Sequence, residues 1–238
     1  MNLEAVKSEE LPLRNLNGLL RAFLSGKWKV ESGKWKVESM DWWKFEKEAK
    51  NEGFNIICGV DEAGRGPLCG DVYAAAVILP FEMQIDGLND SKKLSEKKRE
   101  QLYEIIIQEA ISYGIGYATP AEIDEINILN ASFVAMKRAI DNLKTKPDLA
   151  LIDGNRIKGL DIQAKCIIKG DSLSASIAAA SIIAKVSRDR VMRQLHIKYP
   201  QYNLAQHKGY PTKAHYEAIK QFGINEIYRK SFLKGIDI

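Results

Sequence analysis

The sequence predicts an α/β domain that begins near residue 54, and three observations support this class. Nearly continuous apolar runs at 54–60 and 72–79 are typical of central strands buried on both faces of a sheet. A glycine-rich turn separates the two runs, so we expect the two strands to pair. A further buried run, 148–154, follows a long stretch of helical pattern. Strands and helices interspersed in this way indicate a sheet covered by helices.

Caps and periodicity predict the remaining elements of this domain. A serine or threonine before a helical pattern indicates the helix start, because its side chain accepts a hydrogen bond from a free backbone N–H group. The expected elements are a helix from Ser95 to about residue 111, a strand at 112–117, helical segments from Thr119 to residue 143, a strand at 162–168, a helix dense in alanine and serine from residue 172 toward residue 199, and a helix from Thr212 to about residue 222.

Length and composition limit the classes of protein to which the chain can belong. With 238 residues, one large domain or one domain with an appendage is expected. A chain that is 45% hydrophobic and 28% charged has the composition of a soluble globular protein. No apolar run approaches the roughly 18 residues of a membrane span, and residues 1–4 open no signal peptide. We therefore expect a cytoplasmic protein with no membrane partner.

Charge and cysteine content narrow the chemistry further. The net charge of +4 is mildly basic, which permits a nucleic-acid partner without requiring one. Cys58, Cys69 and Cys166 are scattered along the chain and share no CxxC spacing. Neither a disulfide framework nor a zinc site is therefore indicated. We expect all three cysteines to be small core residues.

The N-terminal part of the chain differs in pattern from the rest. We therefore predict two parts, an extension at 1–53 and the α/β domain at 54–238. An apolar set at helical spacing predicts a short amphipathic helix within 11–24. Residues 41–53 form a second helical pattern, with aromatic and alanine side chains on one side.

A seven-residue repeat lies inside this extension. The sequence Gly-Lys-Trp-Lys-Val-Glu-Ser at 26–32 recurs unchanged at 33–39, and two copies are too few for a solenoid. On a strand each tryptophan shares a face with its valine. A strand pair turning near Gly33, or a flexible tether, is therefore favoured over a helix. A recent duplication without function is the leading interpretation; the alternative is a basic arm whose tryptophans stack on bases.

Acidic side chains follow three of the predicted strands. They are Asp61 with Glu62, Asp153, and Asp171. Ligands of open α/β sheets gather at the carboxyl ends of strands, so three such ends favour one shared site over separate solvated acids. Successive side chains of a strand point to opposite faces. We therefore expect the first strand to stop between Asp61 and Glu62, where the glycines that follow supply a bend.

These carboxylates predict a metal site. Four acids with no histidine or cysteine beside them suit Mg²⁺ or Mn²⁺ better than zinc. Two such ions about 4 Å apart clamp the attacking and leaving oxygens of a phosphoryl displacement. The positive N-terminus of the alanine-rich helix is expected beside the acids. Glycoside hydrolysis is the alternative, but it needs only two carboxylates. Basic residues available to offset phosphate charge are Lys92, Lys93, Lys169, Lys185 and Arg188.

Residues 207–215 are basic, turn-rich and aromatic. Tyr210 lies between a glycine and a proline, so we expect it to be rigid and exposed. An exposed tyrosine of this kind suits stacking on a sugar or base. A tyrosine that packs within a loop is the alternative.

Six motifs, in order along the chain, carry a resemblance to a known family. They are Gly-Val-Asp-Glu-Ala-Gly-Arg-Gly-Pro-Leu at 59–68, Asp-Ser-Lys-Lys-Leu-Ser at 90–95, Ile-Asp-Gly at 152–154, Lys-Gly-Asp at 169–171, the stretch 179–190, and the stretch 207–215. Together they resemble the bacterial ribonuclease HII family over about residues 53–232.

The resemblance implies a ribonuclease H-like fold: a mixed central sheet flanked by helices, with a C-terminal helical extension and an N-terminal appendage. It implies a monomeric endonuclease that cuts the RNA strand of RNA/DNA hybrids and also cuts 5′ of single ribonucleotides in duplex DNA. The implied cofactors are two Mg²⁺ or Mn²⁺ ions, and the implied products carry 3′-hydroxyl and 5′-phosphate ends. The implied role is in ribonucleotide excision repair. By matching motifs, the catalytic and metal-binding residues would be Asp61, Glu62, Asp153 and Asp171. Those that bind substrate would be Gly64, Arg65, Gly66, Lys92 and Tyr210.

Two positions depart from the family pattern. Asp71 adds a charge after the glycine-rich motif, which either alters metal affinity or faces solvent. Tyr228 stands where the family has histidine. Two rival functions stay open: a different two-metal nuclease or phosphotransferase on the same fold, and a hybrid-binding module without catalysis. The presence of all four acids favours an enzyme.

Overall fold

The structure, a computed structural model, describes residues 28–31, 34–37, 41–88 and 90–234. The chain divides into two compact units, Met1–Asp41 and Trp42–Ile238. The helix expected within 11–24 lies outside the described residues, and so does most of the segment expected to be flexible.

In the first unit, the two copies of the repeat pair with each other. β1 (Trp28–Glu31) and β2 (Lys34–Val37) are antiparallel, with Trp28 opposite Val37 and Val30 opposite Trp35. Each copy therefore contributes one strand, and the prediction of a strand pair is confirmed.

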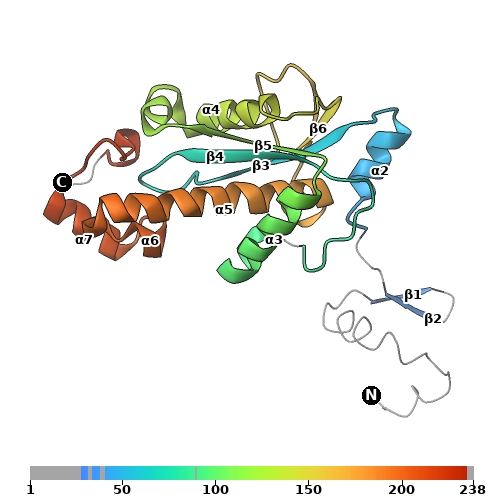
Figure 1. The fold of residues 1–238 in the computed structure, drawn as a ribbon, viewed down its shortest axis with the longest axis horizontal. Helices are drawn as coiled ribbons and strands as arrows, with labels where there is room; N and C mark the ends of the chain where they lie inside the picture. Colours follow the sequence, from blue (N-terminus) through green and yellow to red (C-terminus); the bar gives the residue numbers. More distant parts are fainter. Residues whose placement is uncertain (1–27, 32–33, 38–40, 89, 235–238) are drawn as a thin grey trace, which may run out of the picture. The chain divides into compact units, whose positions relative to one another are not determined.

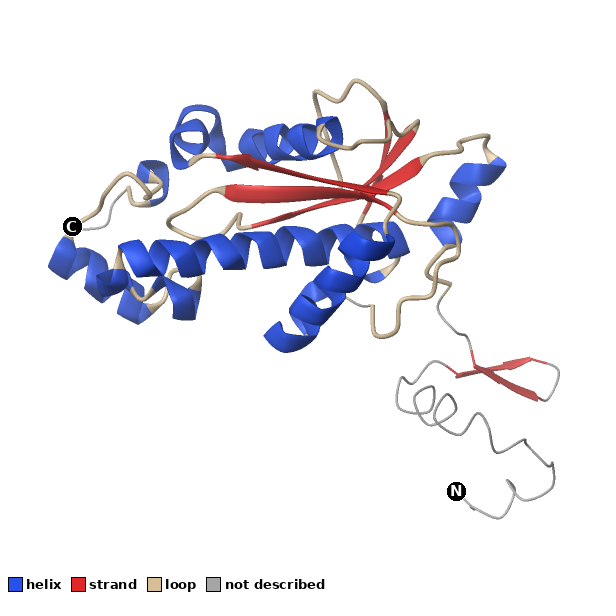
Figure 2. Ribbon diagram, in the orientation of Figure 1, coloured by secondary structure: helices blue, strands red, loops and turns tan. Residues whose placement is uncertain are grey.

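A mixed five-stranded sheet forms the centre of the second unit (Figures 1 and 2). Its strand order is β5-β4-β3-β6-β7. β3 pairs antiparallel with β4 and parallel with β6, so the two apolar runs at its centre pair as predicted. The strands are β3 (Ile57–Ala63), β4 (Val72–Ile78), β5 (Ser112–Ala118), β6 (Leu149–Asp153) and β7 (Gln163–Ile167).

Helices cover both faces of this sheet (Figure 1). α4 (Pro120–Asp141) packs on one face, and α5 (Ala175–Lys198) packs on the other together with α3 (Glu96–Glu109). The small side chains of α5 let it approach β3 closely. A Cβ atom on Gly59 would lie 2.0 Å from a backbone carbon of Ser176, so only glycine fits there.

The predicted helix caps are confirmed by hydrogen bonds. The side chains of Ser95 and Thr212 accept from backbone N–H groups three residues later, at 3.3 and 3.2 Å. Thr119 and Glu122 cap each other reciprocally at the start of α4. α4 is interrupted at Asn127, where φ is 66°, which agrees with the prediction of several helical segments.

The C-terminal residues form the predicted helical extension. It consists of α6 (Leu204–His207), α7 (Lys213–Phe222) and short 3₁₀ turns at Pro200–Tyr202 and Lys230–Phe232. These elements share their own hydrophobic cluster with Leu68 and Cys69, which follow β3. The extension therefore packs against the glycine-rich motif far upstream in the sequence.

Helix α2 (Lys44–Asn51) belongs to the second unit, so this unit begins before the expected boundary at residue 54. The reason is a buried carboxylate. Glu46 is 1% exposed and accepts hydrogen bonds from the Ser174 hydroxyl at 2.6 Å and the Ser176 N–H group at 3.1 Å. It thus neutralises the positive N-terminus of α5. The carbonyl of Trp42 accepts a further bond from Ala175 N.

Two sequence-based expectations about β3 and β7 are wrong. β3 does not stop between Asp61 and Glu62, because its ladder with β4 continues to the pair Ala63–Tyr73. Cys166 is exposed rather than buried, because β7 is an edge strand that α4 and α5 leave partly uncovered. The expectation of burial is confirmed for Cys58 and Cys69.

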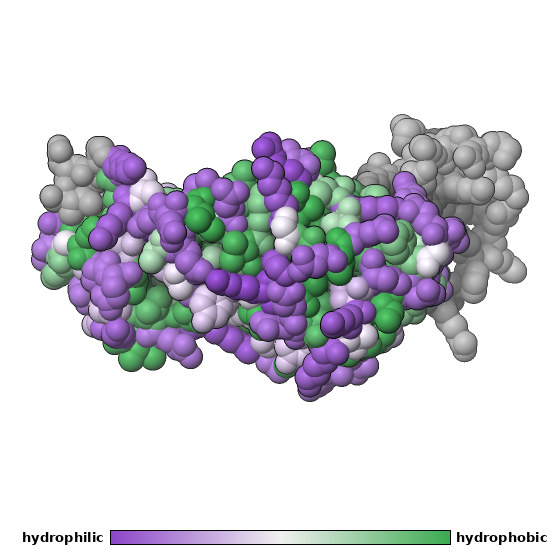
Figure 3. All heavy atoms as spheres, turned by 90° about the horizontal axis from the view of Figure 1, so that it is seen from above, coloured by the Kyte–Doolittle hydropathy of each residue, from purple (hydrophilic) through white to green (hydrophobic). Residues whose placement is uncertain are grey.

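The surface of the second unit mixes polar and apolar side chains. Seen from the α4 side, hydrophilic residues cover most of the face, with hydrophobic residues between them (Figure 3). Among the described residues, no helix has the length and apolar character needed to cross a membrane.

We predict that Glu46→Ala lowers the free energy of unfolding by about 1–3 kcal/mol, because the N-terminus of α5 loses a buried acceptor. Glu48→Ala on the same helix is the control, since its pairing with Lys44 is at the surface and contributes little. Urea unfolding of both variants measures the difference. Equal effects would show that Glu46 does not stabilise α5.

Candidate active site

Three aspartates from three different elements converge at one end of the sheet. Asp61 is on β3, Asp153 ends β6, and Asp171 lies in a 3₁₀ turn (Gly170–Ser172) after β7. Each offers a carboxylate oxygen, and these atoms all lie within 4.8 Å of one another. Because β3 and β6 are parallel neighbours, their carboxyl ends meet at the same edge. The predicted convergence is thus confirmed for these three acids.

Glu62 lies apart from this group of three. Cys58 and Val60 pack with the cluster on the α4 side, so alternation along β3 directs Asp61 toward α5 and Glu62 toward α4. The Glu62 carboxylate accepts a hydrogen bond from Arg65 at 3.2 Å. Burial raises the pKa of Glu62, Arg65 lowers it, and the charge of Asp153 raises it again, so Glu62 still interacts electrostatically with Asp153.

Burial and mutual repulsion make ionisation of these acids less favourable. Burial raises the pKa of Asp61 well above its usual value, and the charges of Glu62 and Asp153 raise it further. Burial and the charge of Asp171 also raise the pKa of Asp153. A divalent cation bound among these oxygens would relieve the repulsion. The donor set contains only carboxylate oxygens, so it fits a hard cation such as Mg²⁺ or Mn²⁺.

Fixed hydrogen bonds orient two of these carboxylates. Asp153 Oδ1 accepts from Gly170 N at 2.7 Å, which ties the end of β6 to the turn that carries Asp171. Asp61 accepts from Glu62 N at 2.7 Å. Asp61 also interacts with the Ser181 hydroxyl of α5, and Ser181 in turn shares a hydrogen bond of 2.7 Å with Ser91. Ser91 and Ser181 belong to two of the six sequence motifs, and their hydrogen bond joins segments that are far apart in the sequence.

Of the basic residues considered, Lys92 is the one that reaches the acids. Its ammonium group lies 3.5 Å from Asp171 Oδ2, and its side chain is 77% exposed. Arg188, by contrast, is 1% exposed and donates its hydrogen bonds to backbone carbonyls, so the expectation that it offsets phosphate charge is wrong. Lys185 is half-buried and pairs with Asp189 at 2.7 Å. Lys93 pairs with Asp90.

The turn at 64–66 directly follows β3, the strand that carries Asp61 and Glu62. Gly64 has φ of +97°, and a Cβ atom there would lie 2.1 Å from Arg188 Nε, so glycine is required on two grounds. In the described part of the chain, the N–H groups of Arg65 and Gly66 donate to no protein acceptor. The turn therefore presents backbone donors beside a carboxylate cluster.

Tyr210 packs against the 64–66 turn, so the two can belong to one substrate site. Its ring is 3.5 Å from the position of a Cβ atom on Gly66, and the residue is 42% exposed. The backbone holds it on both sides: Tyr210 N donates to His207 O, and Tyr210 O faces His215 Nδ1 at 3.0 Å. The expectation of an exposed tyrosine is confirmed.

Tyr228, one of the two departures from the family pattern, supports the segment that carries Tyr210. The Tyr228 hydroxyl lies 3.0 Å from His215 Nε2, and both residues are buried. Because the carbonyl of Tyr210 can only accept, His215 Nδ1 donates to it, and Nε2 then accepts from Tyr228. Burial lowers the pKa of His215 to about 4, which favours this neutral form.

Asp71, the other departure from the family pattern, lies near two buried arginines. Burial raises its pKa, while the charges of Arg229 and Arg188 lower it. Asp71 does not belong to the group of aspartates that could hold a metal. Its side chain thus supplies negative charge close to two buried cations.

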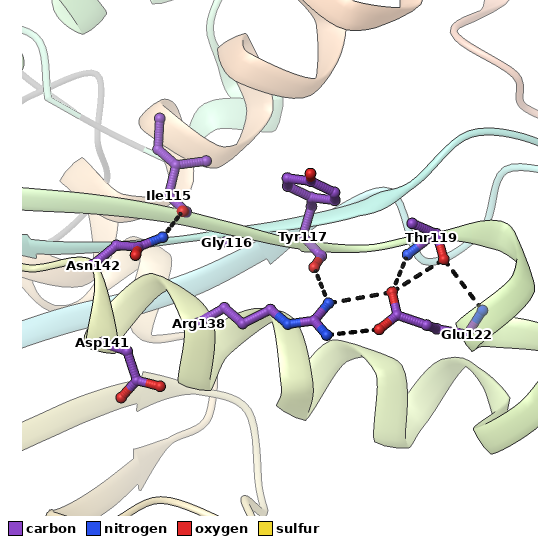
Figure 4. Close-up of a pocket in the computed structure, with 8 residues that line it drawn as sticks. All are labelled: Ile115, Gly116, Tyr117, Thr119, Glu122, Arg138, Asp141 and Asn142. Atoms are coloured by element: carbon purple, nitrogen blue, oxygen red, sulfur yellow. Dashed lines mark hydrogen bonds and ion pairs between the residues drawn. The ribbon is translucent and has the colours of Figure 1, made fainter.

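A cavity of about 660 Å³ lies between β5 and α4, and none of the predicted catalytic acids lines it. Figure 4 shows that its polar side chains bind one another and the backbone: Arg138 donates to Glu122 and to the carbonyl of Tyr117, and Asn142 donates to the carbonyl of Ile115. Asn142 and Arg138 thereby cap exposed carbonyls of an edge strand. This cavity is a structural feature of the sheet edge rather than a second site.

The mixed sheet, its helices and the three convergent aspartates define a hydrolytic nuclease with a ribonuclease H-like fold. Residues 58–234 match the model of the family described as Ribonuclease HII. The chain is 56% identical over 192 residues to ribonuclease HII of Clostridioides difficile (strain 630), covering 81% of this chain and 75% of that one. The chain belongs to the ribonuclease HII family, and ribonuclease H activity on RNA/DNA hybrids follows from this membership.

Two further comparisons agree with this assignment. Ribonuclease HII of Vibrio parahaemolyticus serotype O3:K6 is 58% identical over 181 residues, covering 76% of this chain and 86% of its own. The crystal structure of ribonuclease H2 from Pyrococcus horikoshii OT3 superposes with a TM-score of 0.61 at 31% identity, covering 74% of this chain and 93% of that one.

We predict that Asp61→Asn and Asp153→Asn each weaken Mn²⁺ binding by at least about tenfold, because a charged oxygen ligand is lost. Asp161→Asn is the control, since this carboxylate is exposed, pairs with Lys137 and lies outside the group of three aspartates. Calorimetric titration with Mn²⁺ measures the affinity. Wild-type affinity in both site variants would contradict the assignment of these ligands.

We also predict a pH dependence from His215. Its pKa is lowered from 6.5 to about 4 in the folded state, so the unfolded chain binds a proton more readily. The stability that His215 contributes is therefore present above pH 6.5 and is lost as the pH falls toward 4, by roughly 3 kcal/mol. Urea unfolding of wild type and His215→Gln measures this: the gap between them should shrink over that range. A constant gap would contradict the prediction.

Proposed function

We propose that this chain cuts the RNA strand of RNA/DNA hybrids and also cuts duplex DNA 5′ of a single embedded ribonucleotide, leaving 3′-hydroxyl and 5′-phosphate ends. One observation carries the proposal: three aspartates lie within 4.8 Å of one another, and the strand that carries Asp61 leads into a turn where the N–H groups of Arg65 and Gly66 donate to no acceptor among the described residues. The acids supply a site for hydrolysis, and the turn supplies a means to recognise the sugar beside it.

For the metal site, we propose that Asp61, Asp153 and Asp171 hold two divalent ions, Mg²⁺ or Mn²⁺, with Glu62 as a fourth ligand. When bound, the ions would stabilise charge on the attacking and leaving oxygens. Glu62 stands nearer to Arg65 in this structure, but its carboxylate still interacts with Asp153.

Recognition of RNA rests on the 64–66 turn. The 2′-hydroxyl is the group that distinguishes RNA from DNA at a single position, and it both donates and accepts hydrogen bonds. The free N–H groups of Arg65 and Gly66 can donate to it. Because Gly66 has no side chain, a sugar can approach the backbone closely.

Two further side chains complete the substrate site. Tyr210 lies against Gly66 and exposes its ring, so it can stack on the deoxyribose next to the ribonucleotide. Lys92 is exposed beside Asp171 and can contact a phosphate oxygen there. We further propose that the chain acts as a monomer in the cytoplasm, on ribonucleotides left in DNA, in ribonucleotide excision repair.

We predict that the chain cuts a DNA duplex with one ribonucleotide in the presence of Mg²⁺ or Mn²⁺ and leaves the all-DNA duplex intact. A chelator should abolish cutting, and Asp61→Asn should abolish it while duplex binding persists. Denaturing electrophoresis of end-labelled strands locates the cut and identifies the ends. Equal cutting of both duplexes would rule out recognition of the 2′-hydroxyl, and turnover by Asp61→Asn would rule out its role as a ligand.

A further inference from the structure

Arg229 is completely buried, and its guanidinium donates hydrogen bonds to backbone carbonyls within residues 64–70. Its nitrogens donate to the carbonyl of Gly64 at 2.7 Å, of Arg65 at 3.1 Å, of Pro67 at 2.8 Å and of Gly70 at 2.9 Å. Four of the five guanidinium N–H groups are used in this way. A single side chain from the C-terminal extension thus binds four carbonyls, two of them in the 64–66 turn.

These bonds determine where the backbone donors of the turn point. In a trans peptide the carbonyl and the following N–H group point in opposite directions. When the carbonyls of Gly64 and Arg65 face Arg229, the N–H groups of Arg65 and Gly66 face away from it. The Pro67–Leu68 peptide shows the same arrangement: its carbonyl binds Arg229, and Leu68 N donates to the carbonyl of Gly209, next to Tyr210.

The guanidinium is held by these carbonyls rather than by a carboxylate. In the part of the chain that the structure describes, no acid lies within ion-pair distance of Arg229. The Phe232 ring, 5.2 Å away, and the more distant charges of Asp71 and Asp124 provide the remaining stabilisation. A buried cation with this many carbonyl partners restricts the turn to one conformation, because any displaced carbonyl leaves a charged donor unsatisfied.

We propose that Arg229 is a positioning residue for ribonucleotide recognition: by binding the carbonyls of Gly64 and Arg65, it directs the N–H groups of Arg65 and Gly66 toward the substrate 2′-hydroxyl. This inference rests on the proposed reading of the 2′-hydroxyl by the 64–66 turn. Arg229 itself is buried and does not touch the substrate. Its loss should therefore reduce discrimination between RNA and DNA, and leave phosphate-dependent binding of the duplex largely in place.

The test measures binding preference in the full-length chain carrying Asp61→Asn, so that no substrate is cut. Fluorescence anisotropy in Mg²⁺ gives Kd for two duplexes that differ by one 2′-hydroxyl. Arg229→Lys keeps the charge but lacks the planar set of donors. Arg229→Gln removes the charge, so it leaves no unpaired buried cation if the lysine variant does not fold. Leu102→Ala, a buried position on α3 remote from the turn, is the control for general destabilisation.

We expect the parent to prefer the ribonucleotide duplex and both Arg229 variants to lose about tenfold of that preference, the effect of losing one or two aligned hydrogen bonds. Kd for the all-DNA duplex should change less than about twofold, and Leu102→Ala should keep the preference. Retained preference in the Arg229 variants, or an equal loss in Leu102→Ala, would overturn the proposal and leave the proposed function standing. No preference in the parent would instead refute the reading of the 2′-hydroxyl itself.

Discussion

Burial of two arginine guanidiniums against backbone carbonyls is the interaction on which the site depends. Arg229 binds carbonyls of the glycine-rich motif, and Arg188 of α5 binds those of Cys69, Asp71 and Lys208. Burying a cation is costly unless its donors are satisfied, so both side chains tolerate few arrangements of the backbone around them. The C-terminal extension is therefore part of the architecture of the turn that follows β3, across 165 residues of sequence between Gly64 and Arg229.

A second constraint acts on the acids, and it opposes stability. Burial and mutual repulsion raise the pKa values of Asp61 and Asp153, so the folded chain holds negative charge where it is disfavoured. The fold maintains this arrangement with bonds from Gly170 N, from Ser181 and from Lys92. Such a concentration of disfavoured charge is a common property of catalytic sites, because the same charges attract a cation. The arrangement therefore lowers the stability of the fold while it favours the binding of a cation.

Particular residues show how far the sequence could predict this protein. Ser95, Thr119 and Thr212 cap helices as predicted, because a cap depends on atoms three residues away. Apolar runs predicted β3, β4 and β6 for a similarly local reason. Cys166 and Arg188 were wrongly placed, because burial of a side chain depends on which element covers it. The end of β3 was also wrong: the ladder with β4 extends past Asp61, and local glycines do not reveal a partner strand.

By itself, the sequence determined the α/β class, the order of the elements, the family and the identity of the acidic residues, since each depends on local pattern or on motifs in order. Only the tertiary structure decided which acids meet, on which face of β3 Glu62 lies, that α2 belongs with the second unit, and that Arg229 binds the 64–66 turn. These facts rest on contacts between segments far apart in the chain. Periodicity and caps carry no information about such contacts, because they express the preferences of neighbouring residues alone.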